Sequence, residues 1–204
     1  MPGTLLPILG RIMPSTRYMT LADLALPRTG AARDILLVVG TSLVTALAAQ
    51  AAVHLPWTPV PITGQTYAVL LSGAVLGWRR AFLAQALYLL EGACGLPVFA
   101  GGGAGVHLLA GPTGGYLVAF PFAAAVTGLL AEHRWDRGFL SMFAAMLLGS
   151  TVIFGLGLYR LSLFLPGPQL LAAGLYPFLP GDLIKSALAA LAFPATWRWA
   201  GRQQ

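Results

Sequence analysis

Residues 139–159 read FLSMFAAMLLGSTVIFGLGLY and contain no charged side chain. A helix needs about 20 apolar residues to cross the roughly 30 Å hydrocarbon core of a bilayer, so this stretch predicts a membrane-spanning helix. Hydrophobic residues make up 57% of the chain and charged residues only 9%. Soluble domains carry about 25% charged residues, so this chain has too few charges to cover a surface that faces water. We therefore expect lipid to be its solvent.

Other apolar segments follow one another with only short breaks, which predicts an all-α integral membrane protein, a compact bundle of six transmembrane helices. The second and third segments are short and end at Pro or Gly. Irregular backbone is tolerated at membrane depth only where it is buried in protein or lines water, so these interruptions suggest an internal cavity. Residues 1–33 are predicted to form a cytoplasmic tail, and residues 34–204 a substrate-binding transmembrane domain. The predicted spans are Ile35–Leu55, Gln65–Gly77, Arg80–Leu96, Gly114–Ala131, Phe139–Tyr159 and Asp182–Ala200.

The basic residues alternate from loop to loop. Three loops, at about 56–64, 97–113 and 161–181, contain no Lys or Arg. Loops rich in Lys and Arg stay in the cytoplasm, so the alternation predicts an even number of spans with both termini cytoplasmic. Because the basic residues flank apolar spans, the net charge of +6 does not indicate a nucleic-acid partner. The arginines of the tail, of the other two loops and of the C-terminus are Arg11, Arg17, Arg28, Arg33, Arg79, Arg80, Arg134, Arg137, Arg198 and Arg202.

The segment Pro177-Phe-Leu-Pro-Gly-Asp182-Leu-Ile-Lys185 opens the last span. Asp182 and Lys185 are three residues apart and share one face of a helix. In one interpretation Asp182 caps the helix and Lys185 extends toward the membrane interface. In the other, the ammonium binds a ligand carboxylate and the carboxylate accepts N–H bonds from an amide-like ring.

Two further loops carry candidate ligand-binding residues. Pro59-Val-Pro-Ile-Thr63-Gly-Gln65-Thr-Tyr67 forms either a lid that presents Thr63, Gln65 and Tyr67 to a cavity or a rigid outer loop. The glycine-rich stretch Gly95–Gly105 precedes Gly111-Pro-Thr-Gly114-Gly115-Tyr116. A helix that begins near Gly114 would offer free backbone N–H groups to polar ligand atoms; a flexible outer loop is the alternative.

Single residues are less specific. Glu91 would be costly inside a span unless it is hydrogen-bonded; it binds substrate or braces Arg160, and we favour the bracing role. His54 and His107 have no second ligand at a fixed helical spacing, so no metal site is expected. In the first span, small residues at Ser42, Ala46 and Ala49 allow close helix packing, either within the bundle or against a partner protein.

These segments together resemble the BioY family, the biotin-specific substrate-binding (S) components of energy-coupling factor (ECF) transporters. The resemblance covers about residues 35–190. It rests on the order and spacing of four motifs: Pro59-Val-Pro-Ile-Thr-Gly-Gln-Thr66, Gly95-Leu-Pro-Val-Phe-Ala-Gly101, Gly111-Pro-Thr-Gly-Gly-Tyr116 and Pro180-Gly-Asp-Leu-Ile-Lys185.

The resemblance implies biotin binding near the outer face of a bacterial cytoplasmic membrane, and partnership with a transmembrane T component and two ATPases. Carried over by position, the binding residues are Asp182, Lys185 and Tyr116, followed by Gln65, Thr63 and the Gly114–Gly115 turn. The family's Ala-xxx-Ala docking motif corresponds here to Ser42 and Ala46, a small-for-small departure.

The chemistry of biotin agrees with these residues. We expect Lys185 to pair with the valerate carboxylate and Asp182 to accept a ureido N–H. The chain has no nucleotide-binding motif, so no cofactor is expected and energy would come from partners. Alternatives are a carrier that works without partners or an S component for riboflavin or thiamine, whose rings are expected to need more aromatic stacking than this cavity offers. An intramembrane enzyme is disfavoured because no Ser/Lys dyad, His-Glu pair or paired aspartates occur at catalytic spacing.

Overall fold

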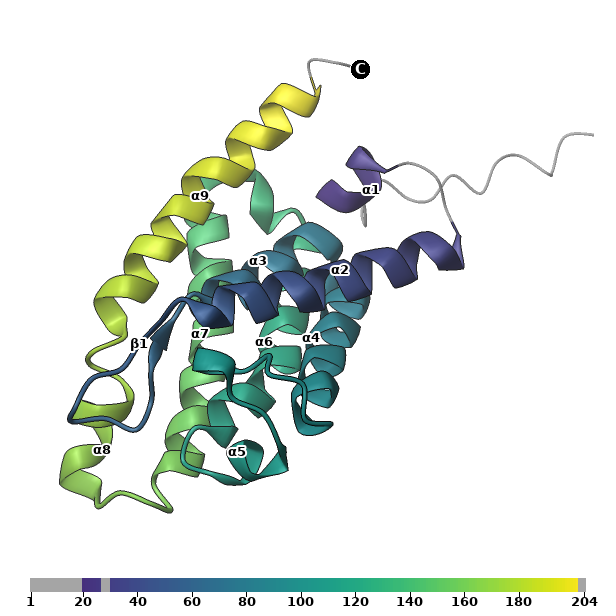
Figure 1. Ribbon diagram of the computed structural model, residues 1–204. Coiled ribbons are helices and arrows are strands. Elements are labelled where there is room, and N and C mark those ends of the chain that lie inside the picture. The colour runs from purple at the N-terminus through teal and green to yellow at the C-terminus, as the bar shows by residue number, and fades with distance from the viewer. Residues whose placement is uncertain (1–19, 27–29, 202–204) are drawn as a thin grey trace, which may run out of the picture.

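The structure, a computed structural model, describes residues 20–26 and 30–201. Long helices make up most of this part of the chain. They match the six predicted segments in order (Figure 1). The long helices are α2 (Ala31–Gln50), α3 (Gln65–Leu76), α4 (Trp78–Ala93), α6 (Gly114–Glu132), α7 (Phe139–Leu161) and α9 (Leu179–Gly201).

Short elements fill the connections between the long helices. Strands β1 (Ala52–Val53) and β2 (Ile62–Thr63) form an antiparallel hairpin in which Ala52 pairs with Thr63. The remaining elements are α1 (Leu21–Ala25), the 3₁₀ turn η2 (Ala100–Gly102), α5 (Val106–Ala110), the 3₁₀ turn η3 (Trp135–Arg137) and α8 (Gly167–Gly174).

Four described stretches are long and apolar enough to cross a membrane, so the chain is a multi-pass helical membrane protein. Helix α3 is apolar but has only 12 residues, and α4 has 16 and begins with Trp78-Arg79-Arg80. The four stretches are Ala31–Gln50, Gly114–Glu132, Phe139–Leu161 and Gly167–Trp199, the last of which includes α8 and most of α9.

Helix α6 is the centre of the bundle. It packs against α7, α3 and α4, while α9 packs along α7, and α2 lies obliquely across α3 and α4 (Figure 1). Close helix contact at the centre depends on glycine. A Cβ at Gly73 of α3 would lie 2.4 Å from the carbonyl oxygen of Ala124 in α6, and one at Gly128 would lie 2.6 Å from the backbone of Gly77. Small residues allow such approach in lipid, where helix association relies on van der Waals contact.

Several element boundaries differ from the prediction. Helix α9 begins at Leu179, so Asp182 lies in the first turn and is not the cap; Pro180 is tolerated there because the first turn needs no backbone N–H. Helix α2 ends at Gln50 because the following residues enter the hairpin. The predicted division between residues 33 and 34 falls inside α2. The predicted tail residues 1–19 and 27–29, with Arg11, Arg17 and Arg28, lie outside the described residues.

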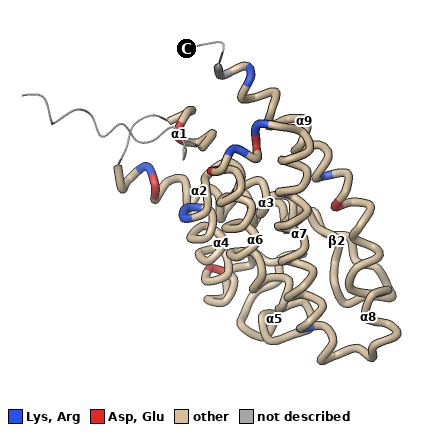
Figure 2. Tube along the Cα trace, turned by 180° about the vertical axis from the view of Figure 1, so that it is seen from behind, with Lys and Arg blue, Asp and Glu red and all other residues tan. Residues whose placement is uncertain are grey.

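Charged residues gather at one end of the bundle, where α1, η3 and the C-terminal part of α9 lie (Figure 2). We call this the basic end; its arginines are Arg33, Arg79, Arg80, Arg134, Arg137 and Arg198. The hairpin, α5 and α8 lie toward the opposite end (Figure 1). We call this the cavity end, for the site described next.

Candidate ligand-binding site

A cavity of about 560 Å³ lies among the hairpin, the glycine-rich loop and the ends of α3, α6, α7 and α9. Its volume is within the range of about 300–1,000 Å³ that is typical of small-molecule sites. Five residues predicted to bind ligand line it. They are Thr63, Gln65, Tyr116, Asp182 and Lys185, whereas Tyr67, which the lid was expected to present to the cavity, does not line it.

Asp182 and Lys185 bring opposite charges to the cavity wall without forming an ion pair with each other. The Asp182 carboxylate, 7% exposed, accepts a hydrogen bond from the Ser150 hydroxyl of α7 at 2.7 Å. The Lys185 ammonium donates to the backbone oxygen of Thr63 at 2.9 Å and to the Thr66 hydroxyl at 3.5 Å. The first turn of α9 also favours a carboxylate, because the helix dipole is positive there. Each charge is therefore held by neutral groups and keeps bonding capacity for a ligand.

A chain of hydrogen bonds orients the Gln65 amide. The Thr63 hydroxyl donates to Gln65 Oε1 at 3.0 Å, and the Gln65 amide nitrogen donates to the Tyr88 hydroxyl. Tyr88 donates in turn to the backbone oxygen of Val98 at 3.0 Å. Because the Tyr88 proton is used on Val98, its oxygen must accept from Gln65, and this fixes which end of the amide faces which way. Within the described part of the chain no acceptor bonds the second N–H of the Gln65 amide, so that N–H is available to another acceptor.

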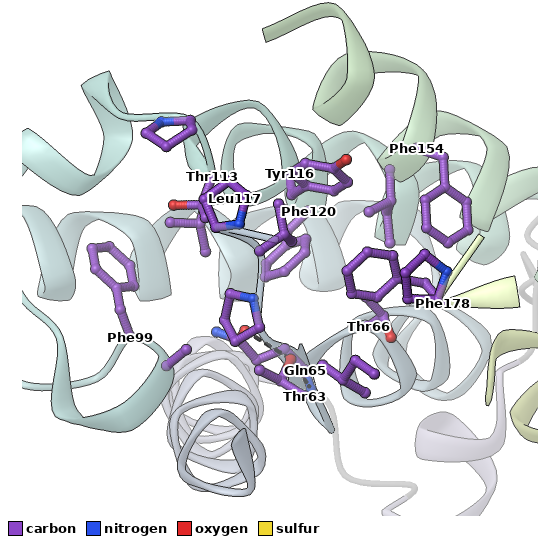
Figure 3. Close-up of a pocket in the computed structure, with 18 of the residues that line it drawn as sticks. Thr63, Gln65, Thr66, Phe99, Thr113, Tyr116, Leu117, Phe120, Phe154 and Phe178 are labelled. Carbon is purple, nitrogen blue, oxygen red and sulfur yellow. Dashed lines mark hydrogen bonds between the residues drawn. The ribbon is translucent and has the colours of Figure 1, made fainter. Parts of the chain in front are cut away.

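Aromatic rings form much of the wall. Figure 3 shows Phe99 on one side, Phe154 and Phe178 on the other, and Tyr116 and Phe120 between them. Tyr116 donates its hydroxyl proton to the backbone oxygen of Gly174 at 2.8 Å, which fixes the ring. The cavity therefore offers more aromatic surface than the sequence indicated. The five rings come from separate segments, and only their packing reveals that they meet.

Gly114 and Gly115 are close-packing positions and lie off the cavity wall. A Cβ at Gly114 would lie 1.8 Å from the Leu109 carbonyl oxygen, and one at Gly115 would lie 2.3 Å from the Leu156 carbonyl oxygen. Side chains cannot fit there, so these glycines allow α6 to approach α5 and α7 and thereby place Tyr116.

Glu91 does not line the cavity, and the prediction that it braces Arg160 is wrong. Its Oε1 lies 3.0 Å from the Ser42 hydroxyl, between α4 and α2. The Arg160 guanidinium instead bonds the carbonyl oxygens of Ala110 and Gly111. Arg160 sits near the end of α7 beside the last turn of α5, whose carbonyls have no partners within their own helix.

Ser42, Ala46 and Ala49 lie on the face of α2 that is turned toward the bundle. Their exposed fractions are 0%, 8% and 0%. The structure packs these residues against the bundle, the alternative left open by the sequence, and leaves them little exposed surface for a partner.

Other cavity residues were not predicted from the sequence. Thr66 and Phe178 fall within quoted motifs and could have been inferred from their neighbours Gln65 and Asp182. Phe120 and Phe154 lie in uniformly apolar stretches that carry no distinguishing signal. His54 and His107 both line the cavity. The described residues contain no group of three or more His, Cys, Asp or Glu side chains suited to a metal ion.

Fold and site together define a multi-pass helical membrane protein with a cavity suited to a small polar molecule. The BioY family model matches residues 16–202. The chain is 42% identical over 140 residues to the biotin transporter BioY of Thermotoga maritima, covering 68% of this chain and 82% of that one. It is 38% identical over 168 residues to the biotin transporter BioY of Rhizobium etli, covering 78% and 90%. The chain therefore belongs to the BioY family, whose named members are transporters and not enzymes.

A solved structure has a similar fold. It is the crystal structure of the S-component for biotin from an ECF-type ABC transporter, with a TM-score of 0.74 and 23% sequence identity. The match covers 84% of this chain and 95% of that chain. At this identity the match establishes the shared fold.

Proposed function

We propose that this protein captures biotin at the outer side of a bacterial cytoplasmic membrane as the S component of an ECF-type transporter. The proposal includes six membrane-spanning helices, α2, α3, α4, α6, α7 and α9, with both termini in the cytoplasm and the cavity end outward. The loops at the cavity end lack Lys and Arg, and the basic end carries the arginines. That asymmetry supports this orientation.

The observation that carries the proposal is the separation of Asp182 and Lys185 on one cavity wall, each bonded to neutral groups. A buried charge without an opposite partner is costly. A ligand that supplies a carboxylate for Lys185 and an N–H donor for Asp182 relieves both costs at once. Biotin carries both groups, a valerate carboxylate and a ureido ring.

The rest of the cavity suits the rest of the ligand. Gln65 keeps one amide N–H that can donate to the ureido carbonyl, and Tyr116 and the phenylalanines offer apolar surface to the thiophane ring. The curated relatives in Thermotoga maritima and Rhizobium etli are named biotin transporters, which supports biotin over other carboxylic acids.

Titration of the purified protein with biotin tests this assignment. We expect Lys185→Ala and Asp182→Asn each to weaken binding by about 30-fold or more, because truncating one partner of a buried charged pair costs about 2–5 kcal/mol. Arg198→Ala, at the exposed basic end, is the control and should retain wild-type affinity. Near wild-type affinity in both cavity variants would contradict the assignment.

A T component and two ATPases are proposed to supply energy. Since Ser42, Ala46 and Ala49 are buried, docking through the first span would use the exposed side chains of α2, such as Leu36, Leu43 and Leu47. Biotin uptake in cells that lack any energy-coupling module tests this part of the proposal. Undiminished uptake there would favour the alternative of a solitary carrier.

Riboflavin or thiamine is the second candidate ligand, and the five aromatic side chains of the cavity favour it more than the sequence suggested. Competition against radiolabelled biotin separates the candidates. Displacement by either vitamin at concentrations equal to biotin would overturn biotin specificity.

A further inference from the structure

Hydroxyl side chains in the long helices mostly bond to their own backbone. Thr45, Thr127, Thr151 and Thr196 each donate to the carbonyl four residues earlier, at 2.8–3.1 Å. This is the usual arrangement in an apolar environment, because the nearby carbonyl is always available.

Ser150 differs from these residues. Its hydroxyl donates out of α7 to the Asp182 carboxylate of α9, at 2.7 Å, and its side chain is 3% exposed. That distance is normal for a hydroxyl donor, and a hydrogen bond to a charged oxygen is about twice as strong as a neutral one. Ser150 itself does not line the cavity. Among the described residues its side chain is hydrogen-bonded only to Asp182, so its influence on the cavity passes through that carboxylate.

The geometry leaves one Asp182 oxygen for the ligand. Ser150 bonds Oδ1, and among the described residues no side chain or backbone group donates to Oδ2. Lys185, three residues along, is engaged with Thr63 and Thr66 and does not hold the carboxylate. A carboxylate without a fixed partner would rotate among several orientations, and binding would have to restrict that motion.

We propose that Ser150 is a positioning residue for substrate recognition: it anchors Oδ1 of Asp182 so that Oδ2 faces the cavity and accepts a ligand N–H. This inference rests on the proposed function, in which Asp182 reads the ureido ring of biotin. It assigns Ser150 to the specificity of the nitrogen-bearing end of the ligand, and not to the carboxylate end at Lys185.

A double-mutant cycle tests the proposal on the full chain purified in detergent. We expect Ser150→Ala to weaken biotin binding on the order of tenfold, the typical loss when a hydrogen bond to a charged group is removed. In an Asp182→Ala background, Ser150→Ala should change affinity by less than about twofold, because Ser150 then has nothing to position. Equal losses in both backgrounds would mean that Ser150 acts through packing alone, and would overturn the proposal.

Two variants separate positioning from folding. Thr151→Ala removes the neighbouring hydroxyl, which is exposed and bonds its own helix, and should leave affinity unchanged. Ser150→Thr keeps the hydroxyl and should restore most of the affinity lost in Ser150→Ala. Failure of Ser150→Thr to bind better than Ser150→Ala, with both variants folded, counts against positioning.

Affinities for biotin analogues provide a measurement that a purely structural role of Ser150 would not change. The ratio of the wild-type affinity to the Ser150→Ala affinity should be about the same for biotin methyl ester as for biotin. It should fall toward one for biotin methylated on the ureido nitrogens. The opposite pattern would overturn the inference while leaving biotin capture intact. Absence of biotin binding by the wild-type chain would instead reject the proposed function.

Discussion

The two ends of the bundle differ in the groups that their charged side chains bond. At the basic end, charges bond to one another and join separate elements. Asp23 of α1 bonds Arg33 of α2 at 3.1 Å and Arg80 of α4 at 2.7 Å, and Arg80 also reaches Asp34 at 2.8 Å. At the cavity end, Asp182 and Lys185 are close in sequence, but their hydrogen-bond partners among the described residues are all neutral.

A second cluster at the basic end repeats the pattern. Asp136, 1% exposed, accepts hydrogen bonds from Trp197 and Arg137, and the Arg137 guanidinium lies 3.2 Å from the centre of the Trp197 ring. Burial nevertheless raises the pKa of Asp136 above its ordinary value, even though the bonds from Trp197 and Arg137 oppose that rise. The cluster fastens α9 to the turn between α6 and α7.

The comparison separates two uses of charge. Paired charges at the basic end stabilise the fold, whereas separated charges at the cavity end are kept for a ligand at some expense of stability. It follows that changes at the cavity end should alter affinity more than stability, and changes at the basic end should do the reverse.

The largest effect is expected when both cavity charges are neutralised. The double variant Lys185→Met and Asp182→Asn should lower biotin affinity by about 10³-fold or more, since two charged contacts are lost. Its unfolding temperature without ligand should equal or exceed that of the wild type, because replacing buried charges by neutral groups is often neutral or stabilising. Calorimetric titration and thermal unfolding in one detergent measure both quantities. A clear loss of stability in the absence of ligand would contradict the proposed difference between the two ends.

The next effect concerns the placement of Tyr116. A Cβ at Gly157 of α7 would lie 2.3 Å from the Tyr116 ring, whereas a Cβ at Gly155 would meet nothing within 4 Å. Overpacking typically costs about 1–3 kcal/mol, so Gly157→Ala should weaken biotin binding by about ten- to a hundredfold by displacing the ring. Gly155→Ala, in the same helix, is the matched control and should bind normally. If Gly157→Ala lowered only the unfolding temperature, Tyr116 would not belong to the site.

A smaller effect is expected from Tyr88→Phe. The substitution keeps the ring, which packs edge-on against Phe99, but removes the hydroxyl that links Gln65 to Val98. The Gln65 amide then loses its fixed orientation, and we expect affinity to fall about tenfold, the loss typical of one buried hydrogen bond. Tyr159→Phe, at a side chain that is 71% exposed, is the control. Unchanged affinity in Tyr88→Phe would mean that Gln65 does not contact the ligand.

Much of the fold could be predicted from the sequence because a lipid bilayer restricts the length and polarity of the segments that can span it. Apolar length and the distribution of arginine predicted six helical segments in the correct order. Boundaries were less accurate: the last span was predicted to begin at Asp182, whereas α9 begins at Leu179, because the first turn of a helix tolerates Pro180. The charged pair of the site was recognisable because charges inside a membrane are rare and functional.

The remaining features of the site depend on which helices meet. Gly114 and Gly115 resemble a ligand-binding turn in sequence, but their role is set by Leu109 and Leu156, which contact them only after folding. Glu91 and Arg160 are both charges within apolar segments, and nothing local indicates that one faces α2 and the other α5. The convergence of five aromatic rings on one cavity is likewise a property of packing and not of any single segment.

The smallest effect on binding is expected at Asp23, where the comparison predicts a change in stability alone. Burial tends to raise the pKa of Asp23, but hydrogen bonds from Arg80 and Thr20 outweigh it and hold the pKa below its ordinary value of 3.8. A carboxyl group whose pKa is lowered by folding stabilises the protein above its unfolded pKa, and this stabilisation is lost as the pH falls through the folded pKa. Asp23→Asn should therefore destabilise the protein by about 1 kcal/mol at neutral pH, and the difference from wild type should shrink below about pH 4.

Thermal unfolding at the two pH values, with biotin titration at neutral pH, measures this prediction. Asp34→Asn is the matched comparison, because among the described residues Asp34 bonds only Arg80 and its side chain is 47% exposed, so its loss should matter less. Biotin affinity should stay within about twofold of wild type in both variants, since independent, distant sites combine additively. A large drop in affinity in Asp23→Asn with unchanged stability would mean that the charges at the basic end act on the cavity, and the functional separation of the two ends would be wrong.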